Sequence, residues 1–170
     1  MRRVIISTIF LFNVIIGQDD IENAAQYKIS LNRANVHSGE ITSLIINVDL
    51  MKDFYIYSSH PEKSLSPSEV EWEDSTLFDA VGILQEPIPK IKYDPNFKMD
   101  IGYHTSTVQF KQDIQISEKL GTGNYSINGT FIYQVCDPII CIPHWDNFSV
   151  QLQVVPGEAL AEFIYPVQTM

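Results

Sequence analysis

Residues 129–152, GTFIYQVCDPIICIPHWDNFSVQL, contain both cysteines of the chain and decide how the rest is interpreted. Apolar residues alternate with polar ones on either side of the cysteines, which is the period of two expected of half-buried strands. The alternating apolar residues are Tyr125, Ile127, Phe131, Tyr133 and Val135 before the pair, and Phe148, Val150, Leu152 and Val154 after it. Asp137-Pro138 initiates a turn, because proline presets φ and has no N–H for a ladder. The stretch therefore predicts a β-hairpin with Cys136 and Cys141 at its tip.

The position of the cysteine pair bears on its purpose. A tight turn between Cys136 and Cys141 would bring their Cα atoms within the range of a disulfide. Closing so short a loop contributes only about 2 kcal/mol through chain entropy, whereas a bridge across about 50 residues contributes about 4 kcal/mol. Small, accessible bridges in turns are more often the labile ones used in exchange. Three interpretations follow from the residues: thiol–disulfide exchange, an inert hairpin bridge and a metal site.

The metal interpretation would join both cysteines to two histidines. His144 lies just after Cys141, and His104 lies in the region before the hairpin, so two sulfurs and two nitrogens could form a set that zinc accepts. The spacing does not match the common finger or ribbon patterns, and an oxidising compartment disfavours free thiols. We therefore expect no metal ion and no cofactor.

Residues 133–143, YQVCDPIICIP, resemble the active-site hairpin in the N-terminal, periplasmic domain of the DsbD thiol:disulfide interchange reductases. The motif of that family is an aromatic residue, a C-x4-C or C-x5-C pair, and then one or two prolines. DFYIYSS, residues 53–59, resembles its aromatic strand, and residues 93–114, YDPNFKMDIGYHTSTVQFKQDI, resemble its cap loop and following strand. The resemblance covers about residues 26–155, and three motifs in order are more specific than the cysteine pair. It makes thiol–disulfide exchange the preferred function.

The start of the chain has the features of an export signal. Residues 1–3 are basic after Met1, residues 4–16 are mostly apolar, and Gly17 offers a small residue for cleavage. The apolar part is too short to span a bilayer comfortably, so we expect a cleaved signal peptide over residues 1–17 and a periplasmic protein. An uncleaved membrane anchor is the alternative, because Ile15 is larger than the residue usual before a cleavage site.

Length and charge bound the remaining possibilities. We expect a short N-terminal segment over residues 18–25, one domain over residues 26–156 and a C-terminal tail over residues 157–170, because about 150 residues suffice for one core. The formal net charge of −10 argues against nucleic acid, whose phosphates demand basic surfaces. It is typical of a solvated surface that keeps an exported protein dispersed, and we expect a monomer.

Strand signals recur along the mature chain, whereas helix signals are scarce. The predicted strands lie at residues 27–31, 44–50, 54–57, 70–73 and 108–116 and in the two arms of the hairpin. Residues 78–92 contain two prolines and are interpreted as an edge strand with a proline-rich exit. Short strands separated by turns predict an all-β, immunoglobulin-like antiparallel β-sandwich, which is also the fold that the resemblance implies. One helical turn is predicted at residues 158–163.

Cys136 and Cys141 are the candidate catalytic residues, cycling between dithiol and disulfide. The reduced form would attack a partner disulfide as a thiolate and pass through a mixed disulfide. By parity Cys136 lies on the strand face opposite Val135. Cys141 leaves the turn later, next to Pro143, and is our choice for the sulfur that joins the partner. The resemblance implies the same roles, with Cys136 as the resolving thiol.

The resemblance also assigns a cap and a lining to the site. Phe97 matches the cap aromatic of the family, which covers the disulfide and moves when a partner docks; anchoring its loop to the core is the alternative. Tyr55 and Tyr57 would line the floor near the cysteines, or simply pack as parts of a strand.

Charged groups near the cysteines are open to two interpretations. Asp94 and Asp137 lie where a carboxylate could raise a cysteine pKa by like-charge repulsion or pass a proton. Either could instead form a turn, because Asp commonly bonds its own backbone two residues on. His144 stands where the family often has a second proline, and it is either a positive charge that favours a thiolate or an exposed loop residue.

The expected partners follow from the resemblance. The family continues into a transmembrane electron-transfer domain and a thioredoxin-like domain, whereas this sequence ends soon after the predicted sandwich. We therefore expect a separate thioredoxin-like or DsbD-type membrane protein to donate electrons, and periplasmic disulfide-containing proteins to accept them. The rival function is a non-enzymatic exported immunoglobulin-like binding or assembly module with a structural disulfide. A structural bridge would resist reduction below about −300 mV.

Overall fold

The computed structural model of the chain describes residues 23–64, 66–73, 76–94 and 98–164. The predicted signal peptide at residues 1–17 and the predicted cap residue Phe97 lie outside them. The strands (β) and 3₁₀ turns (η) are β1 (Ala25–Leu31), β2 (Asn35–Val36), β3 (Ile41–Leu50), β4 (Tyr55–Tyr57), η1 (Pro61–Lys63), β5 (Glu69–Trp72), β6 (Phe78–Gln85), β7 (Lys90–Asp94), β8 (Met99–Thr105), β9 (Thr107–Ile116), β10 (Gly123–Cys136), β11 (Cys141–Val154) and η2 (Ala161–Phe163). None of the described residues belongs to a helix that is long and apolar enough to cross a membrane.

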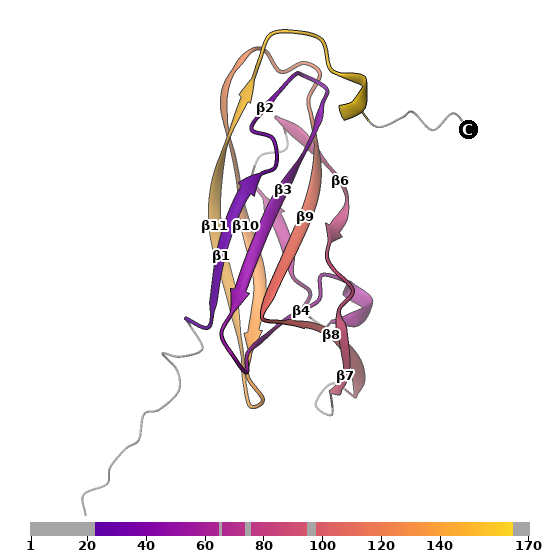
Figure 1. Cartoon of the computed structure of the whole chain (residues 1–170), viewed down its shortest axis with the longest axis vertical. Helices are drawn as coiled ribbons and strands as arrows, with labels where there is room; N and C mark the ends of the chain where they lie inside the picture. The colour runs from indigo at the N-terminus through magenta and orange to yellow at the C-terminus, as the bar shows by residue number, and fades with distance from the viewer. Residues whose placement is uncertain (1–22, 65, 74–75, 95–97, 165–170) are drawn as a thin grey trace, which may run out of the picture.

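Two sheets pack face to face in an elongated sandwich (Figure 1). The first sheet has the strand order β1-β3-β9-β6. The second has the order β2-β11-β10-β4-β8-β7, and β5 also pairs with β10. Among the described strands, β2 and β11 form the one parallel pair. The arrangement confirms the predicted all-β, immunoglobulin-like antiparallel β-sandwich.

The hairpin of β10 and β11 runs along the second sheet and alternates as predicted. Ile127, Phe131, Tyr133 and Val135 of β10 are each at most 2% exposed and belong to the main core. The core also takes residues from β3 and β9, such as Phe110, whose ring centroid lies 5.8 Å from that of Phe131. Burying a large apolar side chain contributes about 1.5–3 kcal/mol, so this row anchors the hairpin almost to its tip.

Gly129 permits the close approach of β5 to β10. It pairs with Trp72 across the two strands. A Cβ atom at this position would lie 2.6 Å from the backbone oxygen of Glu71 and 2.9 Å from Cζ of Phe148. Any side chain here would therefore force the backbone of β5 and the ring of Phe148 to move.

The chain switches between the sheets on both sides of β7 and β8. The strand β6 is an edge strand of the first sheet, as predicted, and the chain then crosses at Pro87 and Pro89 to form β7 at the edge of the second. After β8 it crosses back at Ser106, which has a φ of 66°, and enters β9. The sequence pattern predicts β9 but neither β7 nor β8 as a separate strand. The available signal was a change of parity, since the apolar residues from Ile91 to Tyr103 are odd-numbered and those from Val108 to Ile116 are even-numbered.

The C-terminal part of the described chain packs against the start of β3. The turn η2 falls within the predicted helical turn at residues 158–163. The backbone N–H of Leu160 donates to Oε1 of Glu40 at 2.9 Å, and the Arg33 guanidinium lies 3.4 Å from the ring centroid of Phe163. These contacts lie at the end of the sandwich opposite the hairpin tip (Figure 1).

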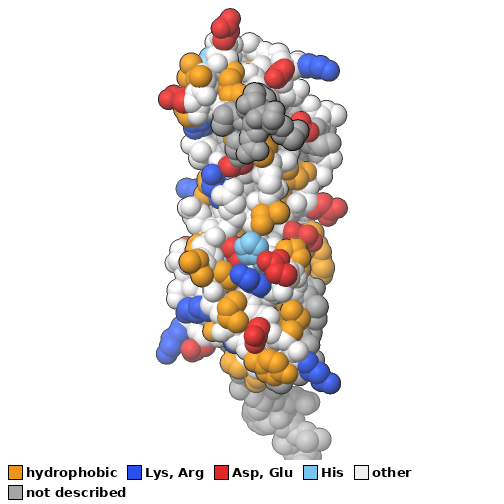
Figure 2. All heavy atoms as spheres, turned by 90° about the vertical axis from the view of Figure 1, so that its right-hand side faces the viewer, with side chains coloured by type: hydrophobic (Ala, Val, Ile, Leu, Met, Phe, Trp, Pro, Cys, Tyr) orange, Lys and Arg blue, Asp and Glu red, His pale blue; other side chains and the backbone are white. Residues whose placement is uncertain are grey.

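The side of the molecule that carries β6, β7 and β8 has a mixed surface. Positive and negative side chains are interspersed over it, with hydrophobic side chains between them (Figure 2). The exposed hydrophobic residues of these strands and their connection include Ile83, Ile88, Ile91 and Tyr93. On this face, therefore, the overall negative charge of the protein is not gathered into one acidic patch.

Candidate functional site

Cys136 and Cys141 form a disulfide that closes the hairpin. They are the last residue of β10 and the first of β11, and they face each other in the register of the hairpin. Their sulfurs are 1.98 Å apart and their Cα atoms 4.0 Å apart. The bridge therefore lies at the hairpin tip, where the alternation and the Asp137-Pro138 pair predict it.

Asp137 shapes the turn between the two cysteines. Its Oδ1 accepts the backbone N–H groups of Ile139 at 2.6 Å and Ile140 at 2.8 Å. Its own backbone N–H donates to the carbonyl oxygen of Ile140 at 3.0 Å. Ile139 is 87% exposed and Ile140 43%, so the turn presents apolar side chains to solvent next to the bridge.

The two sulfur-bearing residues differ in exposure. Cys136 is 0% exposed and packs with Tyr57 and Ile101 in a small cluster separate from the main core. Cys141 is exposed. The parity argument is confirmed, since Val135 belongs to the main core and Cys136 does not. Access from solvent therefore favours Cys141 as the sulfur that a partner reaches.

Three tyrosines form a floor beside the bridge. Tyr55 and Tyr57 project from β4, and Tyr103 projects from the neighbouring strand β8. The ring centroid of Tyr55 lies 5.9 Å from that of Tyr57 and 5.5 Å from that of Tyr103, in edge-to-face geometry. Because β4 pairs with β10 at the Tyr55–Cys136 rung, the floor adjoins the disulfide.

The hydroxyl of Tyr57 contacts the bridge. Its Oη lies 3.4 Å from Sγ of Cys141, and it is the donor, because a disulfide sulfur carries no hydrogen. Burial, followed by the nearby Tyr55 and the negative charge of Asp94, raises the pKa of Tyr57. The hydroxyl thus keeps its proton and remains a donor to Cys141.

A hollow of about 320 Å³ lies between the tyrosine floor and the hairpin turn. Its lining residues are Tyr55, Tyr57, Lys92, Tyr93, Asp94, Asp137, Pro138, Ile139, Ile140 and Cys141. The structure thus brings together five of the residues singled out in the sequence, namely Cys141, the two tyrosines and the two aspartates. Cys136 lies beneath them, whereas Pro143 is exposed on β11, opposite Gln134, and does not line the hollow.

Lys92 belongs to this hollow and was not identified from the sequence. Its Nζ lies 3.5 Å from the ring centroid of Tyr55 and 5.0 Å from that of Tyr103. Recognising residues 90–94 as a strand would have placed Lys92 and Asp94 on one face, since they are two residues apart. Pro87 and Pro89 precede this segment, and because of them it was interpreted as the exit of an edge strand.

The two histidines of the zinc alternative lie in separate surroundings. The ring of His144 stacks on that of Tyr133, with centroids 4.9 Å apart, while Nε2 of His104 contacts Glu86. Within the described ranges, no group of three or more His, Cys, Asp or Glu side chains is placed to hold a metal ion. The described residues therefore offer no support for a zinc site at the hairpin.

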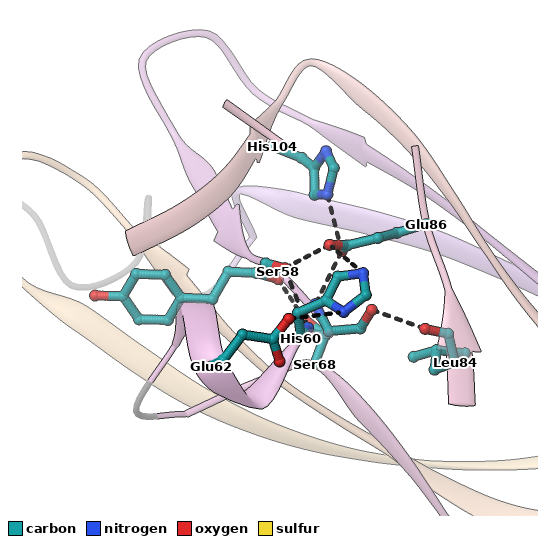
Figure 3. A network of polar contacts seen from close by, with 9 residues as sticks. Ser58, His60, Glu62, Ser68, Leu84, Glu86 and His104 are labelled. Carbon is teal, nitrogen blue, oxygen red and sulfur yellow. Dashed lines mark hydrogen bonds and ion pairs between the residues drawn. The ribbon is translucent and has the colours of Figure 1, made fainter. Parts of the chain in front are cut away.

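The buried carboxylate of Glu86 supports the tyrosine strand, which is β4 with Tyr55 and Tyr57 (Figure 3). The side chain of Glu86, just after β6, is 0% exposed. It accepts hydrogen bonds from the Ser58 hydroxyl, from the Ser59 backbone N–H at 2.8 Å and from His104 Nε2 at 2.9 Å. Burial acts to raise the pKa of Glu86, but the bonds from His104 and the serines outweigh it and lower the pKa. Glu86 therefore ties the first sheet to the end of β4 and to β8.

The site geometry can be set beside known proteins. The sequence model of the family described as "Thiol:disulfide interchange protein DsbD, N-terminal" matches residues 24–166. The reduced N-terminal domain of DsbD from Neisseria meningitidis has a similar structure, with a TM-score of 0.51 and 13% identity over 78% of this chain and 88% of that chain. The N-terminal periplasmic domain of ScsB from Proteus mirabilis gives a TM-score of 0.54 and 16% identity over 78% of this chain and 47% of that chain. At these identities the two structures show a shared fold. No curated protein sequence matches the chain significantly.

Proposed function

The chain belongs to the family of DsbD N-terminal domains and is a thiol:disulfide interchange domain, and we propose that it relays electrons in the periplasm. The donor is a thioredoxin-like or DsbD-type membrane protein, and the acceptors are disulfides of exported proteins. The observation that carries this proposal is the exposed Cys141 bonded to the buried Cys136 at a hairpin tip. Such a pair offers one sulfur to a partner and withholds the other.

The proposed reaction proceeds in two exchange steps. The Cys141 thiolate attacks one sulfur of the acceptor disulfide, a new bond joins Cys141 to that sulfur, and the second acceptor sulfur leaves with the electron pair as a thiolate. The Cys136 thiolate then attacks Sγ of Cys141, which re-forms the internal disulfide and releases the first acceptor sulfur as a thiolate. Two electrons thus pass to the acceptor. The donor dithiol returns them by the same steps in reverse.

Several neighbours have proposed roles in these steps. The Tyr57 hydroxyl donates to Cys141 and so stabilises its charged form, while Tyr55 supports the floor. Asp137 keeps the turn in shape, as its two backbone hydrogen bonds indicate. Asp94 lines the hollow, where a carboxylate can take or give a proton near the thiols.

Two further roles rest on the family resemblance. Phe97 is the proposed cap, an apolar side chain that shields the sulfurs from small oxidants until a partner docks. Pro143 is the proline of the motif and restrains the backbone just after Cys141.

Trapping of partners tests the function and the order of the sulfurs together. Cys136→Ser leaves Cys141 to attack but removes the resolving thiol, so we expect mixed disulfides with thioredoxin and with periplasmic proteins to accumulate on non-reducing gels. The matched variant Cys141→Ser should trap none, because its remaining thiol is buried. Trapping by Cys141→Ser alone would reverse the roles.

The reduction potential of the bridge separates this function from its rival. A disulfide that exchanges with thioredoxin-type proteins should have a potential near theirs, whereas a structural bridge resists reduction below about −300 mV. A value below that limit, together with no trapping by either variant, would leave an exported binding or assembly module.

A further inference from the structure

Lys92 places a positive charge in the hollow that holds Cys141. It lies on β7 opposite Ile101 of β8, and its ammonium rests over the rings of Tyr55 and Tyr103. A cation over the face of a tyrosine is attracted by the negative face of the ring, so these contacts hold the ammonium at the floor. Among the described residues that line the hollow, Lys92 is the one cation.

The two carboxylates of the hollow have the opposite effect on a thiolate. Asp94 of β7 and Asp137 of the turn are carboxylates, and like charges disfavour a second anion nearby. Tyr57 of β4 keeps its proton, as its raised pKa indicates, and the adjacent Tyr55 and Tyr93 are phenols. Without Lys92, the charged groups lining the hollow would all be negative.

We propose that Lys92 supplies the positive charge that stabilises the thiolate of Cys141, and this inference rests on the proposed exchange function. The ammonium acts through space and keeps its own proton in both exchange steps. It favours Cys141 as the attacking thiolate when the acceptor disulfide opens. It also favours Cys141 as the leaving group when the second donor thiolate attacks the donor sulfur that is bonded to Cys141. A more stable thiolate leaves faster.

The test isolates the Cys141 thiol in a Cys136→Ser background and follows its alkylation by iodoacetamide across pH. Lys92→Gln should move the midpoint of the rate profile upward by about half to one pH unit, less than for a charge in direct contact, since Lys92 is partly exposed. In otherwise unaltered reduced protein, Lys92→Gln should slow exchange with glutathione disulfide at neutral pH by roughly two- to threefold, because higher nucleophilicity offsets part of the lost thiolate.

Two matched variants separate charge from packing. Lys92→Arg keeps a cation that stacks on tyrosine and should preserve the wild-type midpoint. Lys90→Gln removes a cation from the same strand, one whose Nζ donates to Thr105 Oγ1 at 2.6 Å and does not line the hollow, and it should leave the midpoint unchanged. High salt should bring the wild-type midpoint toward that of Lys92→Gln, because ions screen the interaction.

An unchanged midpoint in Lys92→Gln would overturn the inference, as would equal shifts in Lys92→Gln and Lys92→Arg. A different measurement, the trapping of partners by Cys136→Ser, tests the exchange function itself. If the midpoint shifts but Cys136→Ser traps no partner, Lys92 still tunes the thiol while the electron relay is wrong.

Discussion

The two sulfurs of the bridge have opposite surroundings although they belong to one rung of one hairpin. Cys136 packs against Tyr57 and Ile101, whereas Cys141 is exposed beside the Tyr57 hydroxyl and shares a hollow with Lys92. Apolar burial disfavours a thiolate because it removes water from the charge, and nearby donors and cations favour one. The proposed division of labour between the thiols therefore rests on side chains of β4, β7 and β8.

Tyr57→Phe tests the donor to Cys141. The substitution removes the hydroxyl 3.4 Å from Sγ and keeps the ring in the floor. We expect exchange with thioredoxin to slow roughly three- to tenfold, since a hydrogen bond is worth about 1 kcal/mol. Tyr103→Phe is the control, because Tyr103 belongs to the same floor and its hydroxyl is not the group that contacts the sulfur. Equal exchange rates in the two variants would show that the Tyr57 hydroxyl has no role in the exchange reaction.

At the scale of the elements, the site depends on where strands end. The hairpin tip extends past Tyr55, the first residue of β4, and β8 and β7 lie on the other side of β4. The hollow therefore forms between the turn, the start of β4 and the end of β7. The turn has its own local support in the two backbone hydrogen bonds to Asp137. This support matters most when the bridge is open, because the disulfide no longer closes the hairpin.

Asp137→Ala tests this support. We expect the free energy of unfolding to fall by about 1 kcal/mol in the reduced protein, since two backbone N–H groups lose the Asp137 acceptor and bond to water in its place. The loss should be smaller in the oxidised protein, where the disulfide also holds the turn. Urea denaturation of both redox states gives the comparison, and Asp137→Asn, which keeps an acceptor oxygen, is the control. A loss that is the same in both states would show that the turn does not depend on the bridge.

At the scale of the whole molecule, Glu86 links the two sheets behind the site. Glu86 directly follows β6 of the first sheet, and its carboxylate binds Ser58 and Ser59, which follow β4, and His104 of β8. Breaking a buried pair of this kind by removing one partner costs about 3–5 kcal/mol. The link therefore fixes the position of the tyrosine strand relative to the rest of the sandwich.

Acid should weaken this link. The folded-state pKa of Glu86 is lowered from the ordinary value of 4.5, so its contribution is fully present above pH 4.5 and is lost as the pH falls below it. Between about pH 6 and pH 3, wild-type protein should lose more free energy of unfolding than Glu86→Gln, because the variant has no carboxylate to protonate. Urea denaturation at each pH measures the two curves. Parallel curves would show that the ionised form of Glu86 does not contribute to stability.

The parts of the fold that the sequence predicts are those with a regular local pattern. The alternation in β3, β9, β10 and β11 extends over much of each strand, and each of these strands appears as predicted. The strands β7 and β8 were not predicted, because prolines precede the first and a change of sheet follows the second. Lys92 and Glu86 were not predicted as site residues either, since neither belongs to a recognisable sequence motif.

By itself the sequence determined the cysteine hairpin, the sandwich and the family, because alternation, turn chemistry and motif order are properties of neighbouring residues. The tertiary structure alone decided that Cys136 is buried and Cys141 exposed, and that Lys92 and Tyr57 share the hollow with Cys141. The physical reason is that burial and electrostatic environment depend on which strands become neighbours. Here β4, β7 and β10 are far apart along the chain and meet in one sheet.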